Sequence, residues 1–582
     1  MYSNKENVNI LTALLVAHGV RHAVVCPGSR NAPIVHNFHE CPDIQCHPVT
    51  DERSAGFYAL GMALCTCEPV VVCVTSGTAL LNLAPAVAEA YYQHVSLVVV
   101  SADRPPQWID QLDGQTLPQP DALGRFVRKA VSLPEPHDPE EHWYCNRLIC
   151  EALTEDLNED LDRGGGPVHI NVPISEPLFQ FDVKELPREA IFSRWDGSVG
   201  YLDIENSGLL AEFWGAKRPM IVIGQNRETV LKDHELEHLR KHAVLLYEPL
   251  GSDLGTTHFD EVLYAKGEDE SLQPDFVLYG GTIVSKRLKK FLRKDTHADF
   301  WEISADGQLH DTFMRTKGVM KSTFLTMLLW LDNYLGNPTL IEEYNEDAEE
   351  PLGALVDKSE YVLRWQKELE CVTVVTETYS PPYSQMAVVK DFEQQLGDSD
   401  ITWNLFSANS MAVRLSCIYS SGYVYCNRGV NGIDGSLSTV AGFSLVAKNP
   451  TFIVIGDLSF FYDQNALWNQ DLNGKLRILL LNNGCGGIFN MLPGLEQSPA
   501  RDKYVAAEHQ TTAEGICQQN RVAYRQAVDM ASMQQGIRWL LQAESQRPLL
   551  LEVITDAAAD ERAFKQYYQT VAHSMEREKP KK

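Results

Sequence analysis

Residues 451–484 read TFIVIGDLSFFYDQNALWNQDLNGKLRILLLNNG. Short apolar runs at 451–455 and 477–481 flank a stretch with helical periodicity at 460–472, which predicts two parallel strands joined by a helix. Asp457 follows the first strand and Asn483 follows the second. Ligands of open parallel sheets bind at this carboxyl edge, where a starting helix presents free N–H groups to an anion such as a diphosphate.

The polar residues at these strand ends suit a magnesium ion. Mg²⁺ prefers hard oxygen ligands in octahedral geometry, shared between protein and substrate phosphates. Asp457, the Asn483 amide and a carbonyl just after it would supply such a set. The alternative is that Asp457 only caps a helix and that Asn482 and Asn483 only form a turn. This stretch alone leaves both interpretations open.

Composition excludes several classes of protein. Acidic residues outnumber basic ones by 78 to 50 among 582 residues, a net charge of −28. This balance argues against nucleic-acid binding, which relies on Lys and Arg. No apolar run approaches the roughly 18 residues of a membrane span, so we expect no membrane insertion. Thirteen cysteines without a Cys-x-x-Cys spacing favour a reduced, cytoplasmic protein over a disulfide framework or a zinc site.

Strand-like runs alternate with helical patterns along the chain, which predicts an α/β protein with three doubly wound parallel-sheet domains. Periodicity lapses near 185–200 and across the acidic run 342–351, which we interpret as a solvated linker. The expected domains are 1–187, 188–350 and 351–582. Helices are expected at 54–65 and 78–93. The expected strands are 23–26, 70–75, 97–101, 168–172, 220–224, 244–247, 276–280, 300–303, 403–406, 423–426, 452–455, 478–481 and 549–554.

Glu52 lies in the sequence Thr-Asp-Glu-Arg-Ser-Ala-Gly at 50–56, between a predicted strand and a predicted helix. A glutamate at a helix start is commonly a charge that complements the helix dipole. Together with the Gly-Asp to Asn-Asn segment, however, it resembles the thiamine diphosphate enzymes of the pyruvate decarboxylase superfamily. In these enzymes a first-domain glutamate bonds the aminopyrimidine of the cofactor, and a third-domain Gly-Asp…Asn segment carries magnesium diphosphate.

Further segments narrow this resemblance to one branch of the superfamily. They lie at 26–30, 75–79, 102–105, 408–411, 427–429 and 432–435. In this order they resemble the menaquinone-pathway synthases that make 2-succinyl-5-enolpyruvyl-6-hydroxy-3-cyclohexene-1-carboxylate. The similarity spans nearly the whole chain and is far more specific than any single motif. It implies the thiamine diphosphate-binding fold.

The resemblance also implies a cofactor and an assembly. Thiamine diphosphate with Mg²⁺ or Mn²⁺ is expected between two subunits of a homodimer, or of a dimer of dimers. Glu52 would come from one subunit, and the metal ligands Asp457, Asn483 and the Cys485 carbonyl from the other. Ile433 would support the bent cofactor, although ordinary core packing is the alternative for such a residue. The remaining expected cofactor contacts are Ser76, Ser410, Leu458, Ser459, Ile488 and Phe489.

The implied reaction decarboxylates 2-oxoglutarate and adds the resulting succinyl carbanion equivalent to isochorismate. Both substrates are polyanions, and arginines grip carboxylates in two-point fashion. The alternative for any one of these arginines is that it forms an ion pair at the protein surface and binds no substrate. The expected catalytic residues are Glu52, Ser29, Arg30, Gln115, Arg414 and Arg428. The expected substrate contacts are Ser29, Arg30, Arg104, Gln115, Ser410, Lys286, Arg287, Arg414, Arg428, Phe489 and Leu492.

An alternative function is kept open. Another thiamine diphosphate 2-oxoacid ligase, of the acetolactate synthase type, would use pyruvate and would have less need of arginines for a distal carboxylate. A dinucleotide-binding protein would show Gly-x-Gly-x-x-Gly after an early strand, and the turn at 26–30 lacks it.

Overall fold

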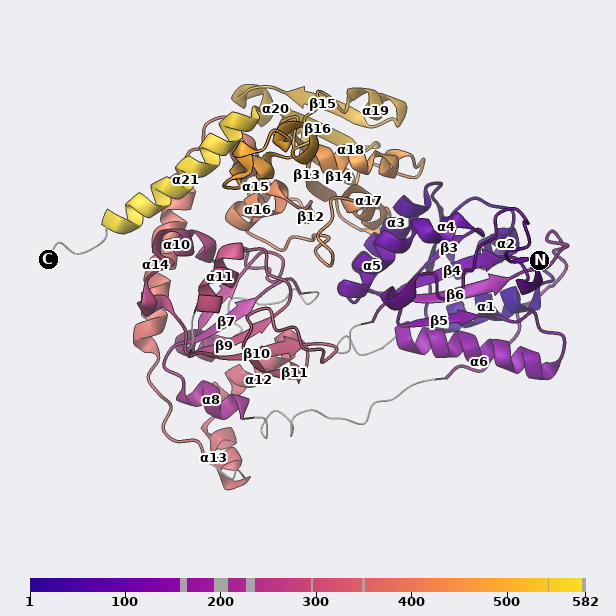
Figure 1. The fold of residues 1–582 in the computed structure, drawn as a ribbon, viewed down its shortest axis with the longest axis horizontal. Coiled ribbons are helices and arrows are strands. Elements are labelled where there is room, and N and C mark those ends of the chain that lie inside the picture. The colour runs from indigo at the N-terminus through magenta and orange to yellow at the C-terminus, as the bar shows by residue number, and fades with distance from the viewer. Residues whose placement is uncertain are drawn as a thin grey trace.

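The computed structural model describes residues 1–156, 165–192, 208–226, 236–294, 297–347, 351–542 and 544–577. Three parallel sheets, each flanked by helices, follow one another along the chain, which confirms the predicted fold class. Figure 1 shows the N-terminal part on one side of the molecule. The C-terminal part lies above the middle part on the other side. Each sheet lies within one of the expected segments, and the exact boundaries stay predictions. Residue 350 and the tail 578–582 lie outside the described residues.

The N-terminal sheet has six parallel strands in the order β2-β1-β3-β4-β6-β5. Its central strands are wholly buried, as a sheet covered by helices on both faces requires. The strands are β1 His22–Val25, β2 Gln45–Pro48, β3 Val70–Val74, β4 Leu97–Asp103, β5 Lys129–Ser132 and β6 Val168–Pro173, and the helices are α1 Glu6–Ala17, α2 Ala32–Glu40, α3 Glu52–Thr66, α4 Thr78–Asn82, α5 Ala84–Tyr92 and α6 Pro139–Asp156.

The middle sheet has five parallel strands in the order β11-β10-β9-β7-β8. A separate apolar core lies between this sheet and helices α8, α9 and α12. The strands are β7 Pro219–Ile223, β8 Val244–Tyr247, β9 Phe276–Gly280, β10 Asp299–Ser304 and β11 Thr316–Lys321, and the helices are α8 Leu209–Gly215, α9 Glu237–His242, α10 Phe259–Lys266, α11 Lys286–Lys294, α12 Phe324–Gly336 and α13 Pro338–Asp347.

The C-terminal sheet has the order β12-β13-β14-β16-β15, again all parallel. Its strands are β12 Asn404–Ser407, β13 Thr451–Gly456, β14 Leu476–Asn482, β15 Ala523–Ala527 and β16 Leu549–Ile554. Its helices are α14 Ser359–Thr378, α15 Gln385–Gly397, α16 Met411–Tyr419, α17 Ser436–Val446, α18 Asp457–Tyr462, α19 Glu514–Gln519, α20 Met530–Leu540 and α21 Ala557–Arg577.

Four expectations about elements were wrong. The helix expected at 460–472 begins earlier, as α18 at Asp457, and gives way to a short 3₁₀ turn at Gln464–Leu467. Residues 423–426 form no strand, only an isolated bridge between Phe406 and Tyr425. The helix expected at 78–93 is divided into α4 and α5, because Pro85 lacks the N–H that would continue it. Part of the expected acidic linker is helical, in α13.

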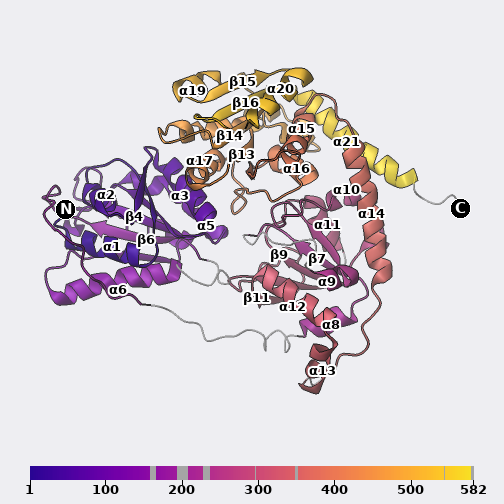
Figure 2. The ribbon, with the colours of Figure 1, turned by 180° about the vertical axis from the view of Figure 1, so that it is seen from behind.

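Two helices join the N-terminal and C-terminal parts of the chain. Helices α3 and α17 cross so closely that glycine is required on both sides. A Cβ added at Gly61 would lie 1.9 Å from the Thr439 carbonyl oxygen, and one at Gly442 would lie 2.2 Å from the Tyr58 carbonyl oxygen. Figure 2 shows this contact from behind, with α3 and α5 turned towards α17. The crossing fixes the start of α3, and with it Glu52, relative to the C-terminal sheet.

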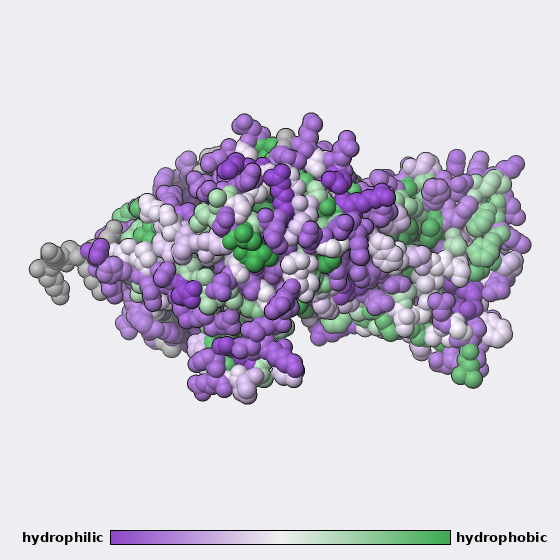
Figure 3. All heavy atoms as spheres, turned by 90° about the horizontal axis from the view of Figure 1, so that it is seen from above, coloured by the Kyte–Doolittle hydropathy of each residue, from purple (hydrophilic) through white to green (hydrophobic). Residues whose placement is uncertain are grey.

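The face drawn in Figure 3 is largely hydrophilic, with separate apolar patches between the hydrophilic residues. None of the helices in the described ranges combines the length and the apolar character that a membrane span needs.

Candidate active site

The carboxyl ends of β13 and β14 bring Asp457 and Asn483 together. The two strands are parallel neighbours with Gly456 opposite Leu481, so the residues that follow them emerge at one edge. Asp457 is the first residue of α18, and Asn483 opens the turn after β14. The strand ends therefore lie where the sequence predicted them.

Asp457 is held by backbone donors. Its Oδ1 accepts from the Leu458 N–H (2.7 Å), and its Oδ2 accepts from the N–H groups of Asn483 (3.2 Å) and Gly484 (2.8 Å). The residue is only 3% exposed, and burial raises the pKa of its carboxyl group despite these donors. The imidazole of His509 lies beside it, with Nε2 3.5 Å from Oδ2. A bound cation would compensate this buried charge.

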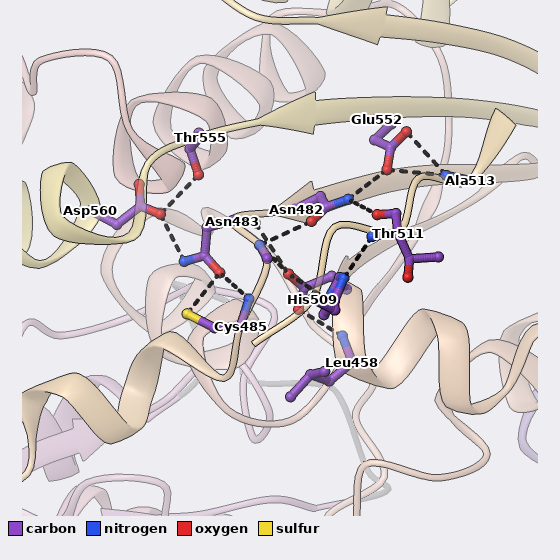
Figure 4. Close-up of polar contacts among 12 residues, drawn as sticks. Leu458, Asn482, Asn483, Cys485, His509, Thr511, Ala513, Glu552, Thr555 and Asp560 are labelled. Carbon is purple, nitrogen blue, oxygen red and sulfur yellow. Dashed lines mark hydrogen bonds and ion pairs between the residues drawn. The ribbon is translucent and has the colours of Figure 1, made fainter. Parts of the chain in front are cut away.

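Asn483 turns its two amide atoms in opposite directions (Figure 4). Its Nδ2 donates to Asp560 Oδ2 at 2.9 Å, whereas its Oδ1 has only long contacts with the N–H and Sγ of Cys485, at 3.4 and 3.8 Å. The Cys485 carbonyl accepts from the Gly487 N–H at 2.9 Å and keeps a second lone pair. Carboxylate, amide and carbonyl oxygens thus lie together, and this donor set fits Mg²⁺ or Mn²⁺.

The Cys485 side chain is a poor nucleophile. Burial, with Asp457 nearby, raises the pKa of the thiol to about 11, so it stays protonated at neutral pH. A metal ligand that acts through its backbone oxygen does not depend on this thiol. Five further expected cofactor contacts lie in elements at the same edge: Leu458 and Ser459 in α18, Ser410 at the start of α16, and Ile488 and Phe489 in the 3₁₀ turn Gly487–Met491. The expected substrate contact Leu492 directly follows this turn.

Glu52 is the first residue of α3 and is half-buried. Its side chain makes no hydrogen bond or ion pair with the described residues. Its carboxylate is therefore available to a ligand. Its two neighbours bind the C-terminal part of the same chain. Asp51 accepts from Asn465 Nδ2 at 2.8 Å, and Arg53 donates to the Tyr462 carbonyl at 2.9 Å.

The N-terminal candidates gather at the carboxyl edge of their own sheet. Arg30 donates to the Ile174 carbonyl (2.9 Å), and burial together with neighbouring Arg104 lowers the pKa of its guanidinium, which stays charged at neutral pH. Arg104 donates to the carbonyl of Gly114 (3.0 Å), next to Gln115. Ser29 is exposed beside Arg30. Ser76 is buried in the turn after β3, where a Cβ on the next residue, Gly77, would touch Gln115.

The cationic candidates of the other two parts differ in their surroundings. Arg428 donates to Asn409 Oδ1 at 3.0 Å, and its Nε is buried without a partner. Arg414 and Lys286 have no ion pair with any described residue. Arg287 is paired with Asp260 and stacks over the ring of Tyr568 at 4.5 Å. Three of these four cations are thus available to anionic substrates.

The loop that carries Arg428 and Ile433 is clamped by a glutamate that the sequence did not single out. Glu89 in α5 is 3% exposed, and its carboxylate accepts from the N–H groups of Gly429 (2.7 Å) and Val430 (2.8 Å). Ile433 remains 41% exposed, unlike an ordinary core residue. His509 and Asp560 were also missed, because a lone histidine and a helix-start aspartate have ordinary structural explanations.

Comparison with known proteins agrees with this geometry. The family model of the N-terminal thiamine pyrophosphate-binding domain of thiamine pyrophosphate enzymes matches residues 6–123. This match covers Glu52 and the turns that carry Ser29, Arg30, Ser76, Arg104 and Gln115. Thiamine pyrophosphate is another name for thiamine diphosphate.

Three full-length relatives carry the name 2-succinyl-5-enolpyruvyl-6-hydroxy-3-cyclohexene-1-carboxylate synthase. The protein of Bacteroides fragilis is 44% identical over 98% of this chain and 99% of its own length. That of Bacteroides thetaiotaomicron is 42% identical, with the same coverage. That of Phocaeicola vulgatus is 40% identical over 99% of this chain and 100% of its own. The chain belongs to the family of thiamine diphosphate-dependent 2-succinyl-5-enolpyruvyl-6-hydroxy-3-cyclohexene-1-carboxylate synthases.

Proposed function

We propose that this chain decarboxylates 2-oxoglutarate and adds the succinyl carbanion equivalent to isochorismate. The products are 2-succinyl-5-enolpyruvyl-6-hydroxy-3-cyclohexene-1-carboxylate and CO₂, in menaquinone biosynthesis. The observation that carries this proposal is the 40–44% identity to synthases of that name over nearly the whole chain. An acetolactate synthase-type reaction has no comparable support.

Bound thiamine diphosphate supplies the electron sink that decarboxylation needs. In our proposal Glu52 hydrogen-bonds the aminopyrimidine, and Ile433 supports the ring system from the C-terminal part. Asp457, Asn483 and the Cys485 carbonyl hold Mg²⁺ or Mn²⁺ with the diphosphate. Leu458, Ser459, Ser410, Ser76, Ile488 and Phe489 complete the cofactor pocket. The free carboxylate of Glu52 and the clustered oxygens at Asp457 support these roles.

The protein must also orient two polyanionic substrates, and this task falls to its cations. Ser29, Arg30, Arg104 and Gln115 would bind carboxylates at the N-terminal edge. Arg414 and Arg428 would do so at the C-terminal edge, next to Phe489 and Leu492. Lys286 is free to reach in from the middle part, whereas Arg287 must exchange Asp260 for a substrate carboxylate. The proposed catalytic set is Glu52, Ser29, Arg30, Gln115, Arg414 and Arg428.

We further propose that two copies of the chain share each site, in a homodimer or a dimer of dimers. The position of Glu52 supports this arrangement. Arg53 binds the last residue of α18, Tyr462, whereas Asp457 is its first. The two ends of such a helix are about 7 Å apart. The neighbour of Glu52 thus contacts the end of α18 opposite the proposed metal ligands of the same chain, and in our proposal a second chain supplies the metal ligands that face Glu52.

A cytoplasmic location fits the chemistry of the thiols. None of the thirteen cysteines, all within the described residues, forms a disulfide in the structure, and buried thiols such as Cys145 and Cys517 are among them. Unpaired thiols persist in a reducing compartment. We therefore propose that the enzyme works in the cytoplasm.

The reaction can be tested directly with the purified chain, thiamine diphosphate and Mg²⁺. Release of CO₂ from 2-oxoglutarate should be faster when isochorismate is present, and the adduct should accumulate. Glu52→Gln should slow the reaction by about 100-fold or more. The exposed residue Glu68 offers a control, because Glu68→Gln should leave the rate unchanged. Turnover of pyruvate with indifference to isochorismate would contradict the proposal.

A further inference from the structure

Asp560 lies in the first turn of α21, outside every motif of the sequence. It contacts the proposed cation site through Asn483. Its Oδ2 accepts from Asn483 Nδ2 (2.9 Å) and Thr555 Oγ1 (2.8 Å), and its Oδ1 accepts from the Gln385 N–H (2.8 Å). Asp560 has no cationic partner among the described residues. This half-buried carboxylate is therefore bound by donors alone.

The contact with Asp560 decides which way the Asn483 amide points. A carboxylate only accepts hydrogen bonds, so the NH₂ end of Asn483 must face Asp560. The Oδ1 end must then face the opposite side, towards Cys485, as Figure 4 shows. The two ends of an amide have nearly the same shape, and without Asp560 a flip would present N–H groups to a cation. Only the observed orientation offers an oxygen ligand.

Capping of the helix does not account for Asp560. The start of α21 is already capped by Asp556, whose Oδ1 accepts from the Ala559 N–H at 2.8 Å. Asp556 is exposed and has no contact with Asn483. The carboxylate of Asp560 instead points away from its own helix, towards the turn after β14 and the start of α15.

We propose that Asp560 is a positioning residue of the cation site. It fixes Asn483 with Oδ1 towards the metal and places a negative charge one amide away from it. The inference rests on the proposed function, because it takes Asn483 as a metal ligand. Outer-shell partners of this kind change metal affinity by about 10- to 100-fold.

The test is a titration of the full chain with Mn²⁺ at saturating thiamine diphosphate, with free Mn²⁺ measured by electron paramagnetic resonance. Asp560→Asn should weaken Mn²⁺ binding by about 10- to 100-fold, because the new amide no longer dictates the orientation of Asn483. Asp556→Asn removes the same charge one helical turn away and should leave the affinity unchanged. If Asp560→Asn does not fold, Asp560→Ser serves in its place with the same expectation.

Exchanging the residue types at positions 560 and 483 separates an effect on the orientation of the residue 483 side chain from general structural damage. In the double variant Asp560→Asn with Asn483→Asp, the new carboxylate has an oxygen on both sides, so no orientation is needed. Mn²⁺ affinity should return to near that of the unmodified chain. Unchanged affinity in Asp560→Asn, or a double variant no better than Asp560→Asn, would overturn the inference. Failure of the proposed cation site gives a different result. If Asp457 and Asn483 bind no cation, Asp457→Ala also leaves the Mn²⁺ affinity unchanged.

Discussion

Buried carboxylates in the C-terminal part differ in the partners that compensate for their burial. Asp457 has three backbone donors, and Glu552 accepts from Asn482, Ala513 and Tyr524. Glu393 in α15 is only 4% exposed, and its Oε1 has no hydrogen-bond partner. Burial raises the pKa of Glu393 to about 8. At neutral pH this side chain is a protonated acid.

This difference gives a pH-dependent prediction for Glu393→Gln. Between the unfolded pKa of about 4.3 and the folded pKa of about 8, the folded state holds a proton that the unfolded state has released. The free energy of unfolding contributed by Glu393 therefore falls as the pH rises through this window, on the order of 1 kcal/mol per unit. Glutamine does not titrate. The variant should gain stability relative to the unmodified chain from pH 5 to pH 8.

Urea unfolding at several pH values measures this difference. The control is Glu360→Gln, at a side chain that is 92% exposed, whose stability difference should not change with pH. A constant difference for Glu393→Gln across the same range would show that the buried acid does not hold its proton.

Two element contacts set the position of the site residues across the chain. The crossing of α3 and α17 fixes the start of α3, where Glu52 lies, and the clamp from α5 fixes the loop of Arg428. At both contacts a glycine lies so close to the other element that a Cβ would overlap a backbone carbonyl oxygen. At Gly429 a Cβ would lie 2.8 Å from the Glu89 carbonyl oxygen. Packing between elements therefore couples the N-terminal part to the loop of Arg428.

The crossing predicts a strong effect for Gly61→Ala. The new Cβ would overlap the Thr439 carbonyl oxygen, so α3 and α17 must separate. We expect a loss of about 1–3 kcal/mol in the free energy of unfolding, as for other overpacked contacts. Gly215→Ala is the control, because a Cβ there meets no atom within 4 Å, and it should be neutral or slightly stabilising. Equal stability of the two variants, measured by urea unfolding, would contradict the close crossing.

Elements with dense apolar patterns could be predicted from the sequence, including the edge strands β8 and β12, whereas edge strands with few apolar residues could not. The strands that were missed, β5, β11 and β15, all lie at sheet edges, where half-exposed sequences such as Ala-Tyr-Arg-Gln-Ala in β15 carry few apolar residues. Asp457 and Asn483 could be paired because they follow neighbouring parallel strands. Asp560 and Glu89 could not, because they meet their partners across 77 and 340 residues of chain. Such contacts depend on tertiary packing alone.

At the scale of the whole molecule, the middle part is tied to the C-terminal part through α21. Tyr568 donates to Asp260 at 3.0 Å, and Tyr567 donates to Glu261 at 3.2 Å. Arg287 stacks on Tyr568 in the same place. The helix α11, which begins at Lys286, is therefore held beside the C-terminal part, where its free cation can serve the substrates.

The central claim is that one chain supplies Glu52 and a second chain supplies Asp457 to the same site. Mixing inactive Glu52→Gln and Asp457→Ala chains under subunit exchange tests it, with isochorismate-dependent CO₂ release as the assay. Half of the sites in each mixed dimer then carry both intact residues, so activity should recover to about a quarter of the unmodified level. No recovery, with mixed dimers demonstrated by mass spectrometry, would place both residues in the site of a single chain.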